Sequence, residues 1–260
     1  MEYIQIFYES FPIYLMVFFR IIGFLIIAPL FSSRNVLSMM KAALAMLISI
    51  LVVPTMVDTP FLTIDSSLLL FFIYALSEFA IGLSIGFIAT LFFDSINLAG
   101  QLIDMQMGFG IVNVVDPQSG AQMPVMGTFK YFLTMFFYLS INGHILLLDA
   151  LMKSYQIIPL GNFTVDMSLM NFIIYVTTNL FVIALKIALP YVGALFATDF
   201  ILGIIARTVP QMNVFMIGMP LKIGIGFVLS IVIIPLYIYI LSAFFEKSFT
   251  DIYTLIRVLS

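Results

Sequence analysis

Four charged side chains lie well inside apolar stretches of this sequence, where an ionised group needs an ionic partner, a protein dipole or water. They are Arg20, Glu78, Lys186 and Asp199. Insertion scales assign about 2.5–3.5 kcal/mol to each charge at a helix centre, so four such charges facing lipid would cost on the order of 10 kcal/mol. We therefore expect them to face protein, water or one another. Buried pairs that lock helix packing and a conduit or proton path are both compatible with this pattern.

A second polar group lies between two very apolar blocks, in the elbow at 206–226, which reads ARTVPQMNVFMIGMPLKIGIG. Pro210 and Pro220 are expected to break helices there, because proline lacks an N–H and clashes with the preceding turn. Backbone groups freed at membrane depth persist only where protein or water covers them. We predict that neighbouring subunits provide this cover. The side chains that offer hydrogen bonds to them are Arg207, Gln211, Asn213 and Lys222.

The residue types used by enzymes are scarce. The sequence has no cysteine, which excludes disulfides, thiolate nucleophiles and cysteine metal sites. It also contains no GxSxG, HExxH, P-loop or dinucleotide-binding motif. The single histidine, His144, follows Gly143 at the head of a helix, where a capping or packing role is more common than ligation. Asp94 and Asp104 lack the partner motif of an intramembrane aspartyl pair. We predict a non-enzyme without metal or cofactor.

The elements that must position these residues are membrane helices. Of 260 residues, 63% are hydrophobic and 9% are charged, whereas soluble domains have about 45–50% apolar and about 25% charged residues. The net charge of −3 gives no basic footprint, so no nucleic acid partner is expected. The start, MEYIQIFYESFP, lacks a positive region before its apolar run, and the first helix is expected to serve as its own insertion signal.

Six apolar blocks follow one another, at 12–31, 42–57, 67–93, 129–152, 168–205 and 223–245. A helix needs about 20 residues to cross the hydrocarbon core, and the first, fourth and sixth blocks fit one span each. The second is short, the third and fifth are too long for one straight span, and Pro190 divides the fifth. Continuous apolar runs exclude a barrel. We predict an all-α integral membrane bundle with several bent or broken helices.

The longest connector, Asp94 to Met123, reads DSINLAGQLIDMQMGFGIVNVVDPQSGAQM. It begins with helical periodicity and is expected to become flexible at Gly108. It contains no Lys or Arg and is too apolar for a solvated linker. Long connectors inside compact domains are usually functional or disordered. We therefore expect this one to enter a space lined by protein.

Small residues recur at the spacing that lets helix backbones approach closely. The pairs are Gly82 with Gly86, Ala184 with Ala188, and Gly193 with Ala197. The tail FFEKSFTDIYTLIRVLS places apolar residues at helical spacing beside Lys247 and Arg257, which predicts an amphipathic helix. Such a helix can lie at the membrane surface or dock on a partner, and we favour the partner.

Five stretches resemble the FliR family of type III secretion export-gate subunits and occur in the order of that family. They are AGQLIDMQMGFG at 99–110, DPQSGAQMPVMG at 116–127, NGHILLLDALMKSY at 142–155, LKIALP at 185–190 and ARTVPQMNVFMIGMPLKIG at 206–224. The last is long and unusual, so the match is specific. The first 90 residues are similar in character more than in motif.

The resemblance implies a non-enzymatic core subunit of the flagellar export gate in the bacterial inner membrane, at the flagellar basal body. In that family one copy joins FliP-like and FliQ-like subunits in a helical ring through which unfolded flagellar proteins pass as cargo. An FlhB-like protein is the implied neighbour of the tail. The resemblance also implies a FliP-like helical part at 1–180, with a plug loop at about 106–122, and a FliQ-like helical hairpin with the tail at 181–260.

The plug of the family, a loop that projects into the pore, carries over onto the residues after Gln106. Its glycines allow movement and its apolar side chains exclude water and ions, while the absence of Lys and Arg keeps fixed positive charge out of the path. The implied plug residues are Met107, Gly108, Phe109, Gly110, Ile111, Val112, Asn113, Val114, Val115, Asp116 and Pro117.

The alternative function is a stand-alone secondary transporter, in which Pro190 and the elbow are broken helices at a substrate site. Transporters also place discontinuous helices with polar backbone at the membrane midplane. The sequence has no clear inverted repeat, and its charged residues do not converge on a recognisable ligand pocket. Co-isolation with partner chains or isolation as a solute-binding monomer distinguishes the two.

Overall fold

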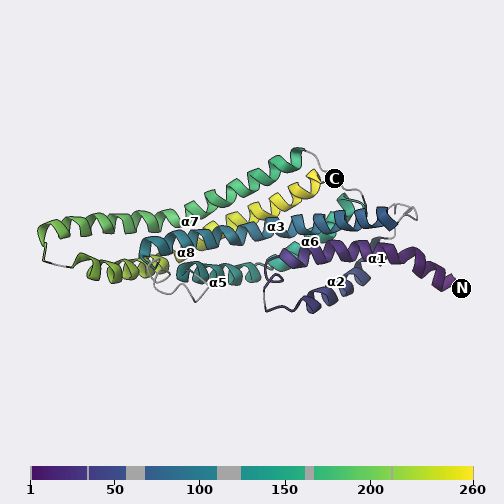
Figure 1. Cartoon of the computed structure of the whole chain (residues 1–260), viewed down its shortest axis with the longest axis horizontal. Helices are drawn as coiled ribbons and strands as arrows, with labels where there is room; N and C mark the ends of the chain where they lie inside the picture. The colour runs from purple at the N-terminus through teal and green to yellow at the C-terminus, as the bar shows by residue number, and fades with distance from the viewer. Residues whose placement is uncertain are drawn as a thin grey trace. The chain divides into compact units, whose positions relative to one another are not determined.

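The computed structural model describes residues 2–33, 35–56, 68–109, 124–161, 167–211 and 213–259. Every regular element in these ranges is a helix, which confirms the all-α prediction (Figure 1). The helices are α1 (Glu2–Ile27), α2 (Ser38–Val52), the short 3₁₀ helix η1 (Val53–Met56), α3 (Leu68–Met107), α5 (Val125–Ser140), α6 (Gly143–Ile157), α7 (Met167–Thr208) and α8 (Val214–Val258).

Two compact units organise the chain. Unit 1 consists of Met1–Leu91, Leu139–Val176 and Glu246–Ser260, and unit 2 consists of Phe92–Tyr138 and Thr177–Phe245. The helices α3, α7 and α8 each contribute a segment to both units. Each unit therefore draws on parts of the chain that lie far apart in sequence.

Four helical segments in the described ranges are long and apolar enough to cross a membrane. They are Ser38–Met56, Leu68–Met107, Met167–Thr208 and Met216–Val258. A bent pair formed by α5 and α6 would make five if it counts as one span, and α1 adds the shorter apolar helix Phe11–Ile27. At 1.5 Å per residue, α3, α7 and α8 are about 60–68 Å long, roughly twice the hydrocarbon thickness.

The structure corrects the predictions for two prolines. Pro190 lies inside the continuous helix α7, and Pro220 lies inside α8. The sequence prediction that these residues divide or break helices was wrong, because membrane helices tolerate an internal proline where the surrounding protein satisfies the freed backbone groups. Of the two prolines in the elbow, Pro210 is the one that lies between helices. The break predicted for the elbow is therefore limited to the connection 209–213 between α7 and α8.

The fourth apolar block was expected to fit one span, and in the structure it is bent. It is divided into α5 and α6, which meet at an angle of 66°. Asn142, between them, has a left-handed backbone conformation with φ of 56°. Asparagine is one of the few residues that adopt this conformation readily. The start of α6 at Gly143 agrees with the predicted position of His144 at a helix head.

The helical periodicity predicted for the start of the connector is confirmed. Helix α3 continues through the apolar block into the connector and ends at Met107. Gly108 follows with φ of +93°, a conformation that L side chains rarely adopt. Residues 110–123 of the connector lie outside the described residues.

Close helix packing explains two of the three small-residue pairs. A Cβ atom at Gly82 would overlap with the carbonyl oxygen of Arg20, and one at Gly86 would lie 3.0 Å from the carbonyl oxygen of Phe24, so α1 rests directly on α3 in unit 1. Ala184 and Ala188 are buried in α7. Gly193 differs: nothing in the described structure lies within 4 Å of a Cβ placed there, so this chain does not use it for packing.

The amphipathic tail is the end of α8 and belongs to unit 1. Its apolar residues Ile252, Ile256 and Leu259 are completely buried. The chain's own helices therefore cover the face that we expected to dock on a partner or a membrane surface.

Candidate functional site

The charges predicted to avoid lipid form a buried pair in unit 1. Arg20 of α1 lies 2.6 Å from the carboxylate of Glu78 on α3, and both side chains are 0% exposed. Arg20 also donates hydrogen bonds of 3.1 Å to the hydroxyl of Ser154 and to the carbonyl oxygen of Ile158. The second oxygen of Glu78 accepts the backbone N–H of Gly161 at 2.9 Å. Buried ion pairs stabilise a protein only when further hydrogen bonds satisfy both partners, and this one meets the condition.

The local sequence explains how this pair forms. Glu78 and Gly82 lie one helical turn apart on α3, so they share a face. Because Gly82 has no side chain, the backbone of α1 touches α3 at Arg20, and the guanidinium meets the carboxylate one turn earlier. The guanidinium also lies 4.3 Å from the centre of the Tyr155 ring. Of the alternatives left open by the sequence, the geometry of Arg20 and Glu78 matches a buried pair that joins α1 to α3.

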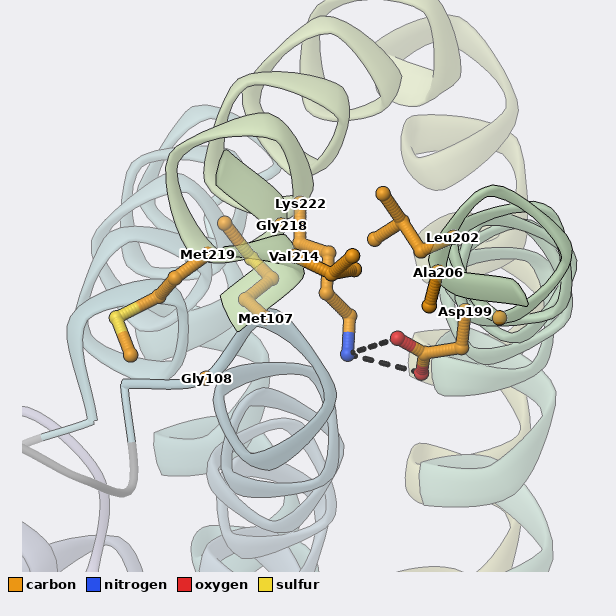
Figure 2. Close-up of a pocket in the computed structure, with 10 residues that line it drawn as sticks. Met107, Gly108, Asp199, Leu202, Ala206, Val214, Gly218, Met219 and Lys222 are labelled. Atoms are coloured by element: carbon orange, nitrogen blue, oxygen red, sulfur yellow. Dashed lines mark hydrogen bonds and ion pairs between the residues drawn. The ribbon is translucent and has the colours of Figure 1, made fainter. Parts of the chain in front are cut away.

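A more open pair occurs in unit 2, between α7 and α8. The ammonium of Lys222 lies 2.7 Å from one carboxylate oxygen of Asp199, and the two side chains are 17% and 43% exposed. Figure 2 shows Lys222 reaching across a cavity toward Asp199. The cavity measures about 370 Å³. It is otherwise lined by Met107, Gly108, Leu202, Gly203, Ala206, Val214, Gly218 and Met219.

Lys186 is exposed near the middle of α7, a helix of 42 residues. No ion pair of Lys186 occurs within the ranges that the structure describes. Its neighbours Leu185 and Leu189 are 52% and 59% exposed, so the charge stands on an apolar surface. Pro190, four residues later, has no N–H for the carbonyl oxygen of Lys186.

The polar residues of the elbow lie at the connection of α7 and α8. Arg207 and Gln211 are exposed. Asn213 caps α8, because its side-chain oxygen accepts the backbone N–H of Met216 at 3.1 Å. The structure thus brings Asp199 and Lys222 together and leaves Lys186, Arg207 and Gln211 on the surface of the chain.

Two buried charges were missed by the sequence analysis. Lys130 of α5 is 2% exposed, and its ammonium donates to the hydroxyl of Tyr191 at 3.0 Å and lies 4.5 Å from the centre of the Tyr237 ring. Asp104 of α3 is 5% exposed and accepts the backbone N–H of Met126. The sequence held one indication of the buried lysine. Lys130 is the second residue of the apolar block 129–152 and follows a connector that contains no Lys or Arg.

The implied plug is only partly described. Met107 is the last residue of α3 and is completely buried, Gly108 lines the cavity of unit 2, and Phe109 is half-buried. Gly110 to Pro117 lie outside the described residues. In the described ranges, no three His, Asp or Glu side chains group as metal ligands would.

Comparisons with known proteins identify what this arrangement resembles. Residues 11–248 match the model of bacterial export proteins, family 1. The flagellar biosynthetic protein FliR of Bacillus subtilis is 41% identical over 228 residues, which cover 86% of each chain. FliR of Escherichia coli is 28% identical over 239 residues, covering 91% of this chain and 88% of its own. The Yop proteins translocation protein T of Yersinia pestis is 30% identical over 189 residues, 71% of each chain.

Proposed function

Because this chain belongs to family 1 of the bacterial export proteins, we propose that it forms and seals, together with partner subunits, the export gate through which unfolded flagellar proteins leave the cytoplasm. It is a membrane component of the flagellar type III export apparatus and not an enzyme. The observation that carries the proposal is the match over 86% of a flagellar FliR. Family membership also sets aside the stand-alone transporter.

The proposed partners are FliP-like and FliQ-like subunits in a hetero-oligomeric ring, with an FlhB-like neighbour. The exposed surface of α7 supports a partner. Lys186 would cost about 2.5–3.5 kcal/mol facing lipid at a helix centre. An apolar helix of a neighbouring subunit that carries a carboxylate would satisfy the ammonium and cover Leu185 and Leu189.

We further propose the division implied by the resemblance, with a FliP-like part at 1–180 and a FliQ-like hairpin at 181–260. The hairpin has physical support in unit 2. There the parts of α7 and α8 that flank the connection 209–213 are joined by the Asp199–Lys222 ion pair. Two antiparallel helices with a short connection are the form expected of such a hairpin.

The residues after Gln106 are the proposed plug, from Met107 to Pro117. Gly108 supplies a backbone conformation that allows a sharp departure from α3, and Met107 anchors the departure in the core of unit 2. Arg207, Gln211 and Lys222 are proposed as polar contacts with neighbouring subunits, because each carries donors near the connection of α7 and α8.

Two measurements on a complex co-expressed with FliP-like and FliQ-like chains test the proposal. In mild detergent the chain should co-isolate with both partners, and isolation as a stable monomer would contradict the assembly. Deletion of residues 108–122 should leave the complex assembled but make the membrane conduct small ions at rest. A membrane that stays tight after this deletion would contradict the plug.

A further inference from the structure

The two ends of the long connector are held together inside unit 2. Helix α3 ends at Met107, just before the connector leaves, and α5 begins at Val125, just after it returns. Both carboxylate oxygens of Asp104 lie 3.1 Å from the backbone nitrogen of Met126, in the first turn of α5. The first turn of a helix has unpaired N–H groups and a partial positive charge. Asp104 thus caps α5 from a different helix.

Close backbone contact supports the same junction one turn earlier on α3. A Cβ atom at Gly100 would overlap with the backbone of Gly127, so α3 and α5 touch without an intervening side chain. Gly100 and Asp104 are four residues apart and share a face of α3. Their neighbours on α5, Met126 and Gly127, are adjacent. The contact of the two glycines therefore sets the distance at which the Asp104 carboxylate reaches the N–H of Met126.

Helix α8 contacts both ends of the connector. A side chain at Gly226 would overlap with Met107, whose thioether fills the space that the glycine leaves. One turn later, the hydroxyl oxygen of Ser230 lies 3.6 Å from the sulfur of Met126 and donates to the carbonyl oxygen of Gly226 at 2.9 Å. Met107, Met126 and Ser230 are 0%, 1% and 5% exposed. One face of α8 thus touches the last residue of α3 and the second residue of α5.

We propose that Asp104, Met107, Met126, Gly226 and Ser230 form a collar that keeps both stems of the connector together and attaches them to α8. Asp104 is its positioning residue, since it joins α3 to α5 directly. With the collar intact, the last turn of α3 and the first turn of α5 follow α8 as one body. The role of the collar in closure rests on the proposed function, whereas its geometry does not.

Spin labels test the geometry in the intact co-isolated complex. The sequence has no cysteine, so cysteines at the exposed positions Gln101 on α3 and Val125 on α5 would carry the only labels on this chain. A narrow distance distribution is expected with Asp104 present, and a broader one in Asp104→Ala. Asp94→Asn, at an exposed carboxylate on the same helix, is the matched control and should keep the narrow distribution. Equal widths in Asp104→Ala and the control would overturn the positioning role.

Ion conductance at rest tests the role in closure. Gly226→Ala should push Met107 out of place and raise the conductance by about 5- to 30-fold, the population change expected of one overpacked contact. Gly224→Ala is the matched control, because nothing lies within 4 Å of a Cβ at Gly224.

The outcomes separate the collar from the plug. Suppose that the deletion of 108–122 makes the membrane leak, but that the resting conductance of the Gly226→Ala complex is no higher than that of the Gly224→Ala complex. In that case the collar has no role in closure and the plug stands. If the deletion does not leak, the plug fails, and with it the role of the collar in closure. The label distances still decide in that case whether Asp104 holds the two stems.

Discussion

Two ion pairs of this chain, one in each unit, have opposite surroundings. Arg20 and Glu78 in unit 1 are completely buried and have further hydrogen bonds from the same unit. Lys222 and Asp199 in unit 2 line a cavity and are partly exposed. The first pair can contribute to stability in the chain alone, whereas the second has room for additional contacts. The difference indicates that Arg20 and Glu78 are satisfied within unit 1, whereas the Asp199–Lys222 pair in unit 2 can still accept further contacts.

The largest expected effect is the loss of one partner in the buried pair. Glu78→Ala leaves the guanidinium of Arg20 without its carboxylate, and an uncompensated buried charge costs about 3–5 kcal/mol. Thermal melting of the purified complex should show a large loss of stability. The control is Asp149→Ala, which removes an exposed partner of Lys153 and should change little. Similar melting of the two variants would mean that the Arg20–Glu78 pair is not a lock.

Lys186→Met tests whether unit 2 contacts other subunits, because a lipid-facing and a partner-facing Lys186 predict effects of opposite sign on assembly of the complex. Lys186→Met removes a charge from an apolar surface, which would favour the complex if the side chain faced lipid. If a carboxylate of a neighbouring subunit pairs with it, as we propose, the same change should weaken assembly by about 1.5–3 kcal/mol. Quantitative co-isolation with the partner chains measures the effect. Improved recovery of the complex would contradict the partner contact.

Alanine substitutions at one glycine of each unit test whether helix packing at these positions differs between the units, as the burial of the ion pairs does. Gly82→Ala forces a side chain against the carbonyl oxygen of Arg20 and should cost about 1–3 kcal/mol. Gly193→Ala meets open space in this chain and should be neutral or stabilise the helix by up to about 1 kcal/mol. Thermal melting of the two variants gives the comparison. A large loss from Gly193→Ala would show a close contact that this chain alone does not make.

The smallest expected effect belongs to the open pair. Partly exposed ion pairs contribute about 0.2–1 kcal/mol, so Asp199→Asn and Lys222→Met should each destabilise the purified complex only slightly. A double-mutant cycle separates the pair from the individual changes. A coupling energy as large as that of a buried pair would show that the cavity is closed in solution, and the contrast between the two units would then disappear.

Local chemistry made part of this structure predictable. The position of the end of α3 followed from Gly108, because glycine adopts a positive φ without steric cost. The start of α6 followed from the position of Gly143 before an apolar run. Arg20, Glu78 and Asp199 were expected to avoid lipid on solvation grounds alone, and each pairs with an opposite charge.

Features that depend on the register of distant helices were not predictable. The partner of Asp104 is the backbone N–H of Met126, which has no partner within its own helix because α5 begins at Val125. The sequence around Asp104 does not differ from that around an ordinary helical carboxylate. Lys130 pairs with aromatic rings on α7 and α8, which no spacing rule connects to it. Pro190 and Pro220 were misjudged because the tolerance of a proline depends on what surrounds the helix.

The burial of Arg20 and Glu78 also restricts how this family can evolve. A lineage that lost Arg20 would carry a stranded carboxylate until Glu78 changed as well, so the two positions should covary among descendants or remain invariant. Lys130 is under a weaker restriction, since its neighbours Tyr191 and Tyr237 are neutral and a methionine there would strand no opposite charge. Substitution histories should therefore show paired changes at the first site and single replacements at the second.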